Sequence, residues 1–158
     1  MRNAEASTLV IRVAERFDVP AIVALFAADA IGGHSDTTDA SALPAYQAAF
    51  EQISLSPNES LYVAEQNGEV VGTFQTVLTT TMTGRGASSL IIEAVQTRAD
   101  CRGRGIGAQM IAFCLEKAKE QGCRQVQLTS NAARLDAHRF YERLGFQKSH
   151  FGFKIKLK

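Results

Sequence analysis

The stretch that decides the fold is RGRGIGAQMIAFCLEKAKEQG, residues 102–122. Three of the chain's 12 glycines, Gly103, Gly105 and Gly107, stand close together at its start, next to arginines. The residues that follow place apolar side chains at helical spacing, so they predict a helix that ends at Gly122. Glycines at the start of a helix let the backbone turn sharply and expose amide groups, and the arginines indicate a negatively charged ligand.

The segments on either side of this stretch predict β-strands. SLIIEAVQTR, residues 89–98, is rich in β-branched residues and leads into the glycines, and RQVQLTS, residues 124–130, follows the helix. A strand, a helix and a strand in this order form a βαβ unit, so the two strands are expected to be parallel neighbours.

The N-terminal half predicts further strands and two helices. Residues 9–13 alternate as a strand, Asp18 is expected to cap a first helix, and a second helix is expected over 44–55. Asn67-Gly68 between two β-rich runs predicts a hairpin with a type I′ turn. After the βαβ unit, LDAHRFYERLG predicts a short helix, and FQKSHFGFKIKLK, residues 146–158, predicts one or two final strands.

This order of elements predicts an α/β (α+β) fold. We expect a mixed, mostly antiparallel sheet that contains a central parallel βαβ unit and carries helices on both faces. The sequence shows no internal repeat, low-complexity tract or linker, so residues 1–158 are expected to form a single domain.

Composition narrows the class of protein. With 46% hydrophobic and 21% charged residues, the composition is typical of a globular protein. The net charge of +1 is too small to attract nucleic acid or acidic membranes by a long-range electrostatic field. No apolar window approaches the length of a membrane span. Cys101, Cys114 and Cys123 form no CxxC pair, which predicts free thiols, no zinc site and a cytoplasmic location.

The glycine-rich turn fits a diphosphate, and three nucleotide-type motifs compete to explain it. A P-loop is excluded because no Gly-Lys-Ser/Thr follows. Gly103-x-Gly105-x-x-Ala108 matches a dinucleotide-binding pattern, but the next strand ends without an acidic residue to hold a ribose. The third motif is Arg/Gln-x-x-Gly-x-Gly/Ala, here residues 102–107, and the alternative to all three is a tight turn without a ligand.

Because of this third motif and the segments around it, the chain resembles the GNAT superfamily of acyl-CoA N-acyltransferases. IIEAVQTRADC, RGRGIGAQMI, VQLTSN and AHRFYERLGF follow one another in that family's order and spacing, and the resemblance covers essentially the whole chain. It implies that acetyl-CoA is the co-substrate, with its diphosphate on the amides of 102–108. It also implies a bulge that separates the fourth strand from the fifth and frees backbone groups for the pantetheine arm. The cofactor-binding residues implied are Val95, Gln96, Thr97, Arg102, Gly103, Arg104, Gly105, Ile106, Gly107, Ala108 and Asn131.

Acetyl transfer to an amine requires a base for the ammonium and an acid for the leaving thiolate. Tyr141 is the candidate acid, because the family places a tyrosine there whose hydroxyl faces the cofactor sulfur; the alternative is a core tyrosine. Glu93 is the candidate base, because a carboxylate in an apolar strand is costly unless it is solvated, paired or functional. A structural salt bridge is the alternative for Glu93. Strand alternation predicts that Glu93, Val95 and Thr97 share one face.

The acceptor site is predicted from the loop between the first two helices, which commonly covers the acceptor in this family. His34 and Asp36 in that loop, and His138 one helical turn before Tyr141, are the candidate substrate-binding residues. A divalent metal on His34, Asp36 and Glu93 is compatible with the resemblance, but their spacing predicts no metal site.

The C-terminal run, residues 134–157, resembles that of aminoalkylphosphonate N-acetyltransferases, which acetylate small aminophosphonates, some with the help of a divalent metal. We therefore expect a small-molecule primary amine as the acceptor, and neither nucleic acid nor membrane as a partner. The alternatives are a protein or peptide N-acetyltransferase and a non-catalytic acyl-CoA-binding regulator. By analogy of fold, the final strands are expected to pair or exchange in a homodimer.

Overall fold

The computed structural model describes residues 7–32 and 34–158. The chain forms two compact units, a first unit that ends at Leu128 and a second unit, Thr129–Lys158. Within the described ranges, no helix is long and apolar enough to cross a membrane.

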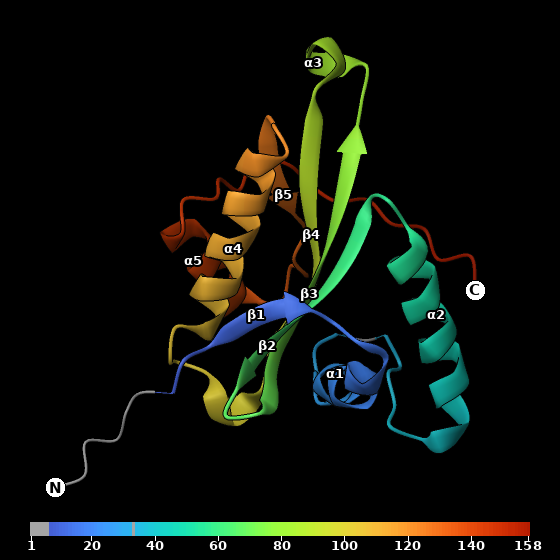
Figure 1. The fold of residues 1–158 in the computed structure, drawn as a ribbon. Coiled ribbons are helices and arrows are strands. Elements are labelled where there is room, and N and C mark those ends of the chain that lie inside the picture. The colour runs from blue at the N-terminus through green and yellow to red at the C-terminus, as the bar shows by residue number, and fades with distance from the viewer. Residues whose placement is uncertain (1–6, 33) are drawn as a thin grey trace, which may run out of the picture. The chain divides into compact units, whose positions relative to one another are not determined.

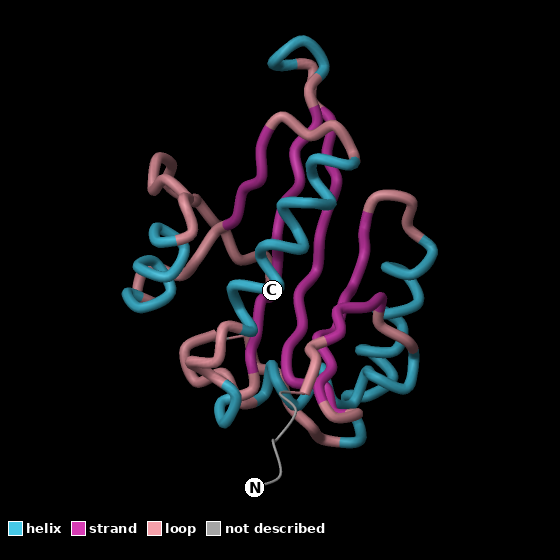
Figure 2. Tube along the Cα trace, turned by 60° about the vertical axis from the view of Figure 1, so that its left-hand side comes forward, coloured by secondary structure: helices cyan, strands magenta, loops and turns pink. Residues whose placement is uncertain are grey.

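The first unit is built on five strands: β1, Val10–Val13; β2, Glu59–Gln66; β3, Glu69–Thr80; β4, Ser88–Thr97; and β5, Gln125–Leu128. They form one sheet in the order β1-β2-β3-β4-β5. Figure 2 draws the strands in magenta. Neighbouring strands are antiparallel from β1 to β4, and β4 and β5 are parallel, with Leu90 opposite Val126. The helix α4, Ile106–Glu120, connects these two parallel strands, which confirms the predicted βαβ unit.

Two hairpins join the central strands. Asn67 and Gly68, with φ of 54° and 75°, connect β2 to β3, which confirms the type I′ turn. The β3–β4 hairpin ends in the single turn α3, Thr83–Gly86, at the far end of the two long strands (Figure 1). Register and turn type are therefore set locally by the residues that allow a positive φ.

Helices cover both faces of this sheet, as predicted (Figure 1). On one face lie α1, Val19–Ala27, and α2, Leu43–Leu55. They contribute Ile22 and Phe50 to an apolar cluster with Val63 of β2. On the other face, Phe113 of α4 packs edge-on against Phe74, with ring centroids 5.9 Å apart. The two layers fix the strands that carry the candidate site.

The start of α1 differs from its prediction. Asp18 precedes the helix, yet its side chain makes no capping hydrogen bond to it. The carboxylate instead accepts hydrogen bonds from the Arg12 guanidinium and from the Glu15 backbone amide. The buried ion pair replaces the cap, because a buried carboxylate needs a charged partner more than a helix terminus needs this one acceptor.

The second unit contains one helix, α5, Leu135–Arg143, which Gly145 follows with a φ of 97°. Residues 146–158 form no strand, so the prediction of one or two final strands is wrong. A strand needs a neighbour to bond its backbone, and the second unit holds no strand that could serve. The segment keeps the period-two pattern of a strand, and four large apolar side chains are exposed: Phe151, Phe153, Ile155 and Leu157.

Candidate functional site

A β-bulge interrupts the middle of β4. Glu93 pairs with Gln75 and Gln96 with Thr73, so Ala94 and Val95 lie opposite a single residue of β3. Ala94 has a φ of 51°, a left-handed conformation that is uncommon outside glycine. The extra residue at the bulge shifts the alternation of every side chain that follows it.

The bulge therefore changes which residues share a face with Glu93. Gln96 lies on the same face as Glu93, whereas Thr97 pairs with Gly72. A Cβ on Gly72 would lie 2.9 Å from the sulfur of Met110 in α4, so this pair belongs to the opposite face. The prediction that Thr97 shares a face with Glu93 is wrong, because alternation counted through the strand ignores the extra residue.

The bulge lies where β4 and β5 stop pairing. Their last paired residues are Ile92 and Leu128, and β4 continues for five residues beyond them, 93–97. Backbone groups of this extension that face the β5 side have no ladder partner from β5 and can bond a ligand. The bulge and the separated strands are both present, as the family resemblance implied.

Glu93 is exposed at this position. Among residues 7–32 and 34–158 its carboxylate has neither a hydrogen bond nor an ion pair. A salt bridge within the described fold therefore does not account for a glutamate in this strand.

The glycine-rich loop ends at the N-terminus of α4. Gly103 and Gly105 have φ of 77° and 80°, and Gly105 is the residue that caps the helix. A Cβ at either would meet nothing within 4 Å, so the backbone conformation, not the space inside the protein, requires glycine at both positions. The backbone amide of Gln109 donates to the carbonyl of Gly105, 3.1 Å away, and is the first amide of the helix to bond within it. The amides of 106–108, which precede it, therefore have no intrahelical acceptors. These amides and the helix dipole form an anion site.

The arginines around this loop divide into two kinds. Arg98 is held by Asp100 at 2.6 Å and Glu69 at 3.1 Å, and these bonds raise the pKa of its guanidinium and lower that of Asp100. Arg102 and Arg104 are exposed and pair with no carboxylate in the described part of the chain. The charge available to an anion therefore comes from Arg102 and Arg104.

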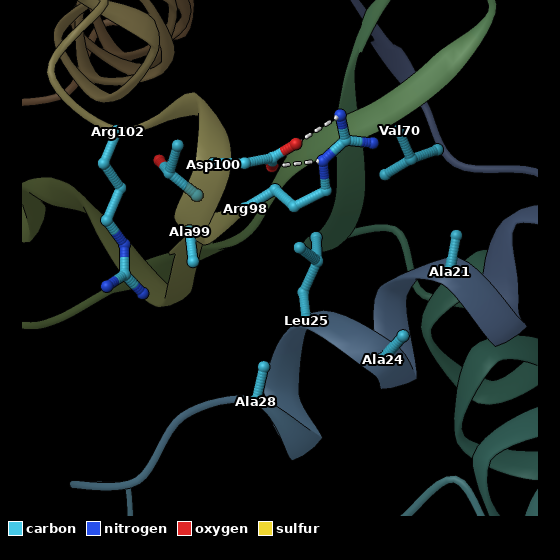
Figure 3. A pocket seen from close by; sticks show the side chains of 10 residues that line it. Ala21, Ala24, Leu25, Ala28, Val70, Arg98, Ala99, Asp100 and Arg102 are labelled. Carbon is cyan, nitrogen blue, oxygen red and sulfur yellow. Dashed lines mark hydrogen bonds and ion pairs between the residues drawn. The ribbon is translucent and has the colours of Figure 1, made fainter.

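A pocket of about 460 Å³ lies between α1 and residues 97–102, which connect the end of β4 to the glycine-rich loop. Small side chains of α1 face the Arg98–Asp100 pair across it (Figure 3). The pocket lies beside the end of β4 and the start of the glycine-rich loop. The lining residues are Ala21, Ala24, Leu25, Ala28, Val70, Thr97, Arg98, Ala99, Asp100 and Arg102.

Two of the points at which the loop after α1 is bonded to the rest of the first unit involve Tyr46 and Gln96. The Tyr46 hydroxyl of α2 donates to Asp36, 2.7 Å away, and accepts from the Thr37 amide at 3.2 Å. The bond to Asp36, followed by burial, raises the pKa of Tyr46. At the other point, Gln96 of β4 donates through Nε2 to Asp29, 2.8 Å away.

Among the predicted acceptor residues, Asp36 therefore has a structural partner that the sequence did not reveal. His34 is exposed. Within residues 7–32 and 34–158, no group of three or more His, Cys, Asp or Glu side chains is arranged to hold a metal ion.

The second unit holds Asn131, His138 and Tyr141. The Asn131 side chain accepts from the amide of Ala133, and its carbonyl accepts from His138 Nε2, each at 2.9 Å. These bonds fix the turn that begins α5. Tyr141 is half-buried, with its ring edge-on to Phe146 at 5.7 Å.

The fold, the separated strands and the anion site define a class of acyl-CoA-binding enzyme, and comparison with known proteins identifies the family. Residues 21–146 match the acetyltransferase (GNAT) family. The chain belongs to this family and is an acetyl-CoA-dependent N-acetyltransferase.

Three similar proteins illustrate the relationship. An aminoalkylphosphonate N-acetyltransferase of Salmonella typhimurium is 36% identical over 109 residues, which are 69% of this chain and 70% of that protein. A crystal structure from Bacillus halodurans, described as a transcriptional regulator, has a TM-score of 0.91 and 37% identity over 95% of this chain and all of that one. A protein of Clostridium acetobutylicum, described as a predicted acetyltransferase and solved with acetyl-CoA, shares the fold at a TM-score of 0.72, with 18% identity over 95% and 97% of the two chains.

Proposed function

We propose that this enzyme transfers an acetyl group from acetyl-CoA to the primary amine of a small anionic molecule, with aminoalkylphosphonates as the first class to test. The observation that carries the proposal is the 36% identity to the Salmonella aminoalkylphosphonate N-acetyltransferase over 69% of the chain. The resemblance of residues 134–157 to such enzymes supports the same acceptor class.

We propose that acetyl-CoA binds at the N-terminus of α4 and along the end of β4, because both leave backbone groups free to bond a ligand. The amides of 106–108, with Arg102 and Arg104, would hold the diphosphate, because both the helix N-terminus and the guanidinium groups favour an anion. Backbone groups of Val95, Gln96 and Thr97 would hold the pantetheine arm, since β4 has no partner there on its β5 side. Asn131 keeps the pantetheine role that the resemblance implies.

We propose that Glu93 is the general base and Tyr141 the general acid. Glu93 would take a proton from the acceptor's ammonium so that the amine nitrogen can attack the thioester carbonyl. The C–N bond forms as the C–S bond breaks, and the Tyr141 hydroxyl would give its proton to the departing thiolate. The second proton lost by the acylated nitrogen would then restore the Tyr141 hydroxyl, and the proton on Glu93 would pass to solvent. The exposure of Glu93 and its lack of a partner within the described residues support the first role.

The acceptor is proposed to contact His34, which is exposed. Asp36 and His138 are each bonded within their own unit, to Tyr46 and to the Asn131 carbonyl. We therefore propose that they shape the acceptor site by orienting these segments.

One other function has an observation in its favour. The Bacillus halodurans protein is described as a transcriptional regulator, which fits a chain that binds acyl-CoA without turnover. Catalysis separates the two proposals, because a regulator of this kind would bind coenzyme A and release none from acetyl-CoA.

The deciding experiment is coenzyme A release from acetyl-CoA with the purified chain and a panel of acceptors, with and without a divalent metal. The panel holds aminoalkylphosphonates, polyamines, aminoglycosides, amino acids and short peptides, and mass spectrometry confirms acetylation of the amine. We expect turnover with aminoalkylphosphonates and weaker turnover with the polyamines and aminoglycosides, which lack an anionic group. Turnover with peptides alone would replace the small-molecule proposal, and binding without turnover would favour a regulator.

We also propose that residues 1–158 act as one domain in the cytoplasm and assemble as a homodimer. The family match spans both units, and the exposed, alternating Phe151 and Phe153 are typical of a strand that pairs with another chain. Light scattering should give a dimer mass for the natural chain and a monomer mass for a variant with serine at both positions. A monomeric natural chain would remove this part of the proposal.

A further inference from the structure

The bond between Asp29 and Gln96 connects the two parts of the first unit that the proposed function uses. Asp29 lies just after α1, at the start of the turn 29–32, and Gln96 lies just after the bulge of β4. Gln96 Nε2 donates to Asp29 Oδ2 at 2.8 Å, and the amide of Ile31 donates to Asp29 Oδ1 at 3.2 Å. One half-buried carboxylate therefore bonds both its own turn and the strand.

This bond depends on the extra residue of the bulge. Gln96 pairs with Thr73, on the face of Glu93, only because Ala94 and Val95 together lie opposite one residue of β3. Without the extra residue, alternation would direct the Gln96 side chain to the opposite face of the sheet, away from Asp29. The bulge thus frees backbone groups and also supplies a side-chain donor to the end of α1.

The residue at position 32 leaves room for this arrangement. A Cβ on Gly32 would lie 2.7 Å from Asp29 Oδ2, the same oxygen that accepts from Gln96. Such a contact is closer than real Cβ atoms approach, so any side chain at position 32 would push the carboxylate off its partner. Gly32 and the bulge, far apart in sequence, both serve the same hydrogen bond.

We propose that Asp29 is a positioning residue of the acetyltransferase: through Gln96 it fixes the turn 29–32 against the bulged strand and so sets the acceptor side of the site. This inference rests on the proposed acceptor role of the segment after α1. The Gln96 side chain carries the link, while its backbone remains available to the pantetheine arm. Loss of the link is therefore expected to weaken acceptor binding and to leave acetyl-CoA binding nearly unchanged.

The test is a double-mutant cycle with Asp29→Ala, Gln96→Ala and the combined variant. Each single change is expected to raise the KM for the amine about tenfold, the size expected for one hydrogen bond to a charged group, with the KM for acetyl-CoA within about twofold. The combined variant should be no worse than the poorer single variant, because both changes remove the same bond. Additive effects, or an unchanged KM for the amine, would overturn the inference.

Tyr46→Phe serves as the matched control, because it removes the bond to Asp36 and leaves the Asp29–Gln96 bond in place. The effect of Tyr46→Phe on the KM for the amine should add to that of Asp29→Ala, because the two changes remove different bonds. If each change only loosened the whole loop after α1, the two losses would be similar in size and would not add.

Hydrogen exchange supplies a readout that needs no activity. Amides of 30–32 should exchange faster in both single variants than in the natural chain, and equal exchange would overturn the link. If the natural chain acetylates no amine of the panel, the proposed function fails, and exchange alone decides whether Asp29 and Gln96 hold the turn.

Discussion

Arg12 of β1 donates two hydrogen bonds to Asp18, of 2.7 and 2.9 Å, and Asp18 is only 2% exposed. The same guanidinium donates to Glu65 of β2 at 2.7 Å. Burial by itself would raise the pKa of Asp18, but the hydrogen bonds from Arg12 and from the Glu15 amide outweigh it and hold the pKa below its ordinary value of 3.8. Asp18 therefore favours the folded state above that value, and this stability is lost as the pH falls through the folded pKa.

Arg12→Ala should destabilise the fold by about 3 kcal/mol at pH 7, because it leaves a buried carboxylate without its cation. The deficit should shrink in acid, since protonation removes the unpaired charge that burial then penalises. Urea unfolding at pH 7 and pH 4 measures both effects. Arg16→Ala is the control: it breaks the exposed pair with Glu51 and should cost less than about 1 kcal/mol. Equal losses in the two variants would contradict the account.

Gly105→Ala should weaken coenzyme A binding about tenfold, the loss expected for one amide bond to a charged group, because a side chain strains the left-handed backbone that aims the amides of α4. Gly122→Ala is matched to it: its φ is 69°, a Cβ there also meets nothing within 4 Å, and it lies beyond the other end of the same helix. Both variants should lose similar stability, about 1 kcal/mol. Calorimetry should show weaker coenzyme A binding for Gly105→Ala than for Gly122→Ala. Equal affinities of the two variants would mean that the diphosphate does not bind at this loop.

Glu93→Gln should lower kcat about 100-fold while coenzyme A still binds, because the amide keeps the size of the carboxylate and cannot take a proton. Glu116→Gln, which breaks only the exposed pair with Lys119 on α4, should leave kcat unchanged. The rates are compared with the best amine of the panel. Should Glu93→Gln retain full activity at neutral pH, a different base must be sought.

The sequence predicted the parts of the fold that depend on local patterns. The Asn67-Gly68 turn and the glycine-rich turn before α4 are confirmed because residues that allow a positive φ encode them locally. The βαβ unit is confirmed because the apolar periods of its strands and its helix can each be read from a short segment. The bulge could not be found in this way from the residues alone. Ala94 has no residue-type preference for a positive φ, and only the pairing with β3 forces it.

The same limit explains what the sequence missed around the candidate site. The partnership of Gln96 with Asp29 spans 67 positions, and that of Asp36 with Tyr46 also crosses from one element to another. Such contacts depend on tertiary placement. The final strands were predicted from alternation alone, but alternation cannot supply the neighbouring strand that residues 146–158 need.

Tyr141→Phe should lower kcat about 100-fold, because the ring packing against Phe146 persists while the proton donor is lost. Phe146→Leu is the control for packing, since it changes the ring contact and keeps the hydroxyl. It should lower thermal stability more than it lowers kcat. If Tyr141→Phe has no effect on turnover while acetyl-CoA still binds, Tyr141 is not the acid.

The three thiols should react in an order set by burial, and none should be needed for activity. Cys114 is fully buried, which raises its pKa to about 12, and Cys101 is buried as well. Cys123 is half-buried, and burial raises its pKa too, so it should react first but slowly. Iodoacetamide at pH 8 should label the native chain once, at Cys123, and label all three positions after unfolding.

Activity should survive this single modification, because transfer from the thioester directly to an amine needs no enzyme thiol. Cys123→Ser should be active and unlabelled in the native state. A chain that loses turnover on labelling, while Cys123→Ser keeps turnover and resists the reagent, would mean only that the added group obstructs the protein. Loss of turnover in Cys123→Ser itself, with an unchanged melting temperature, would instead require a thiol in the chemistry and would contradict direct transfer.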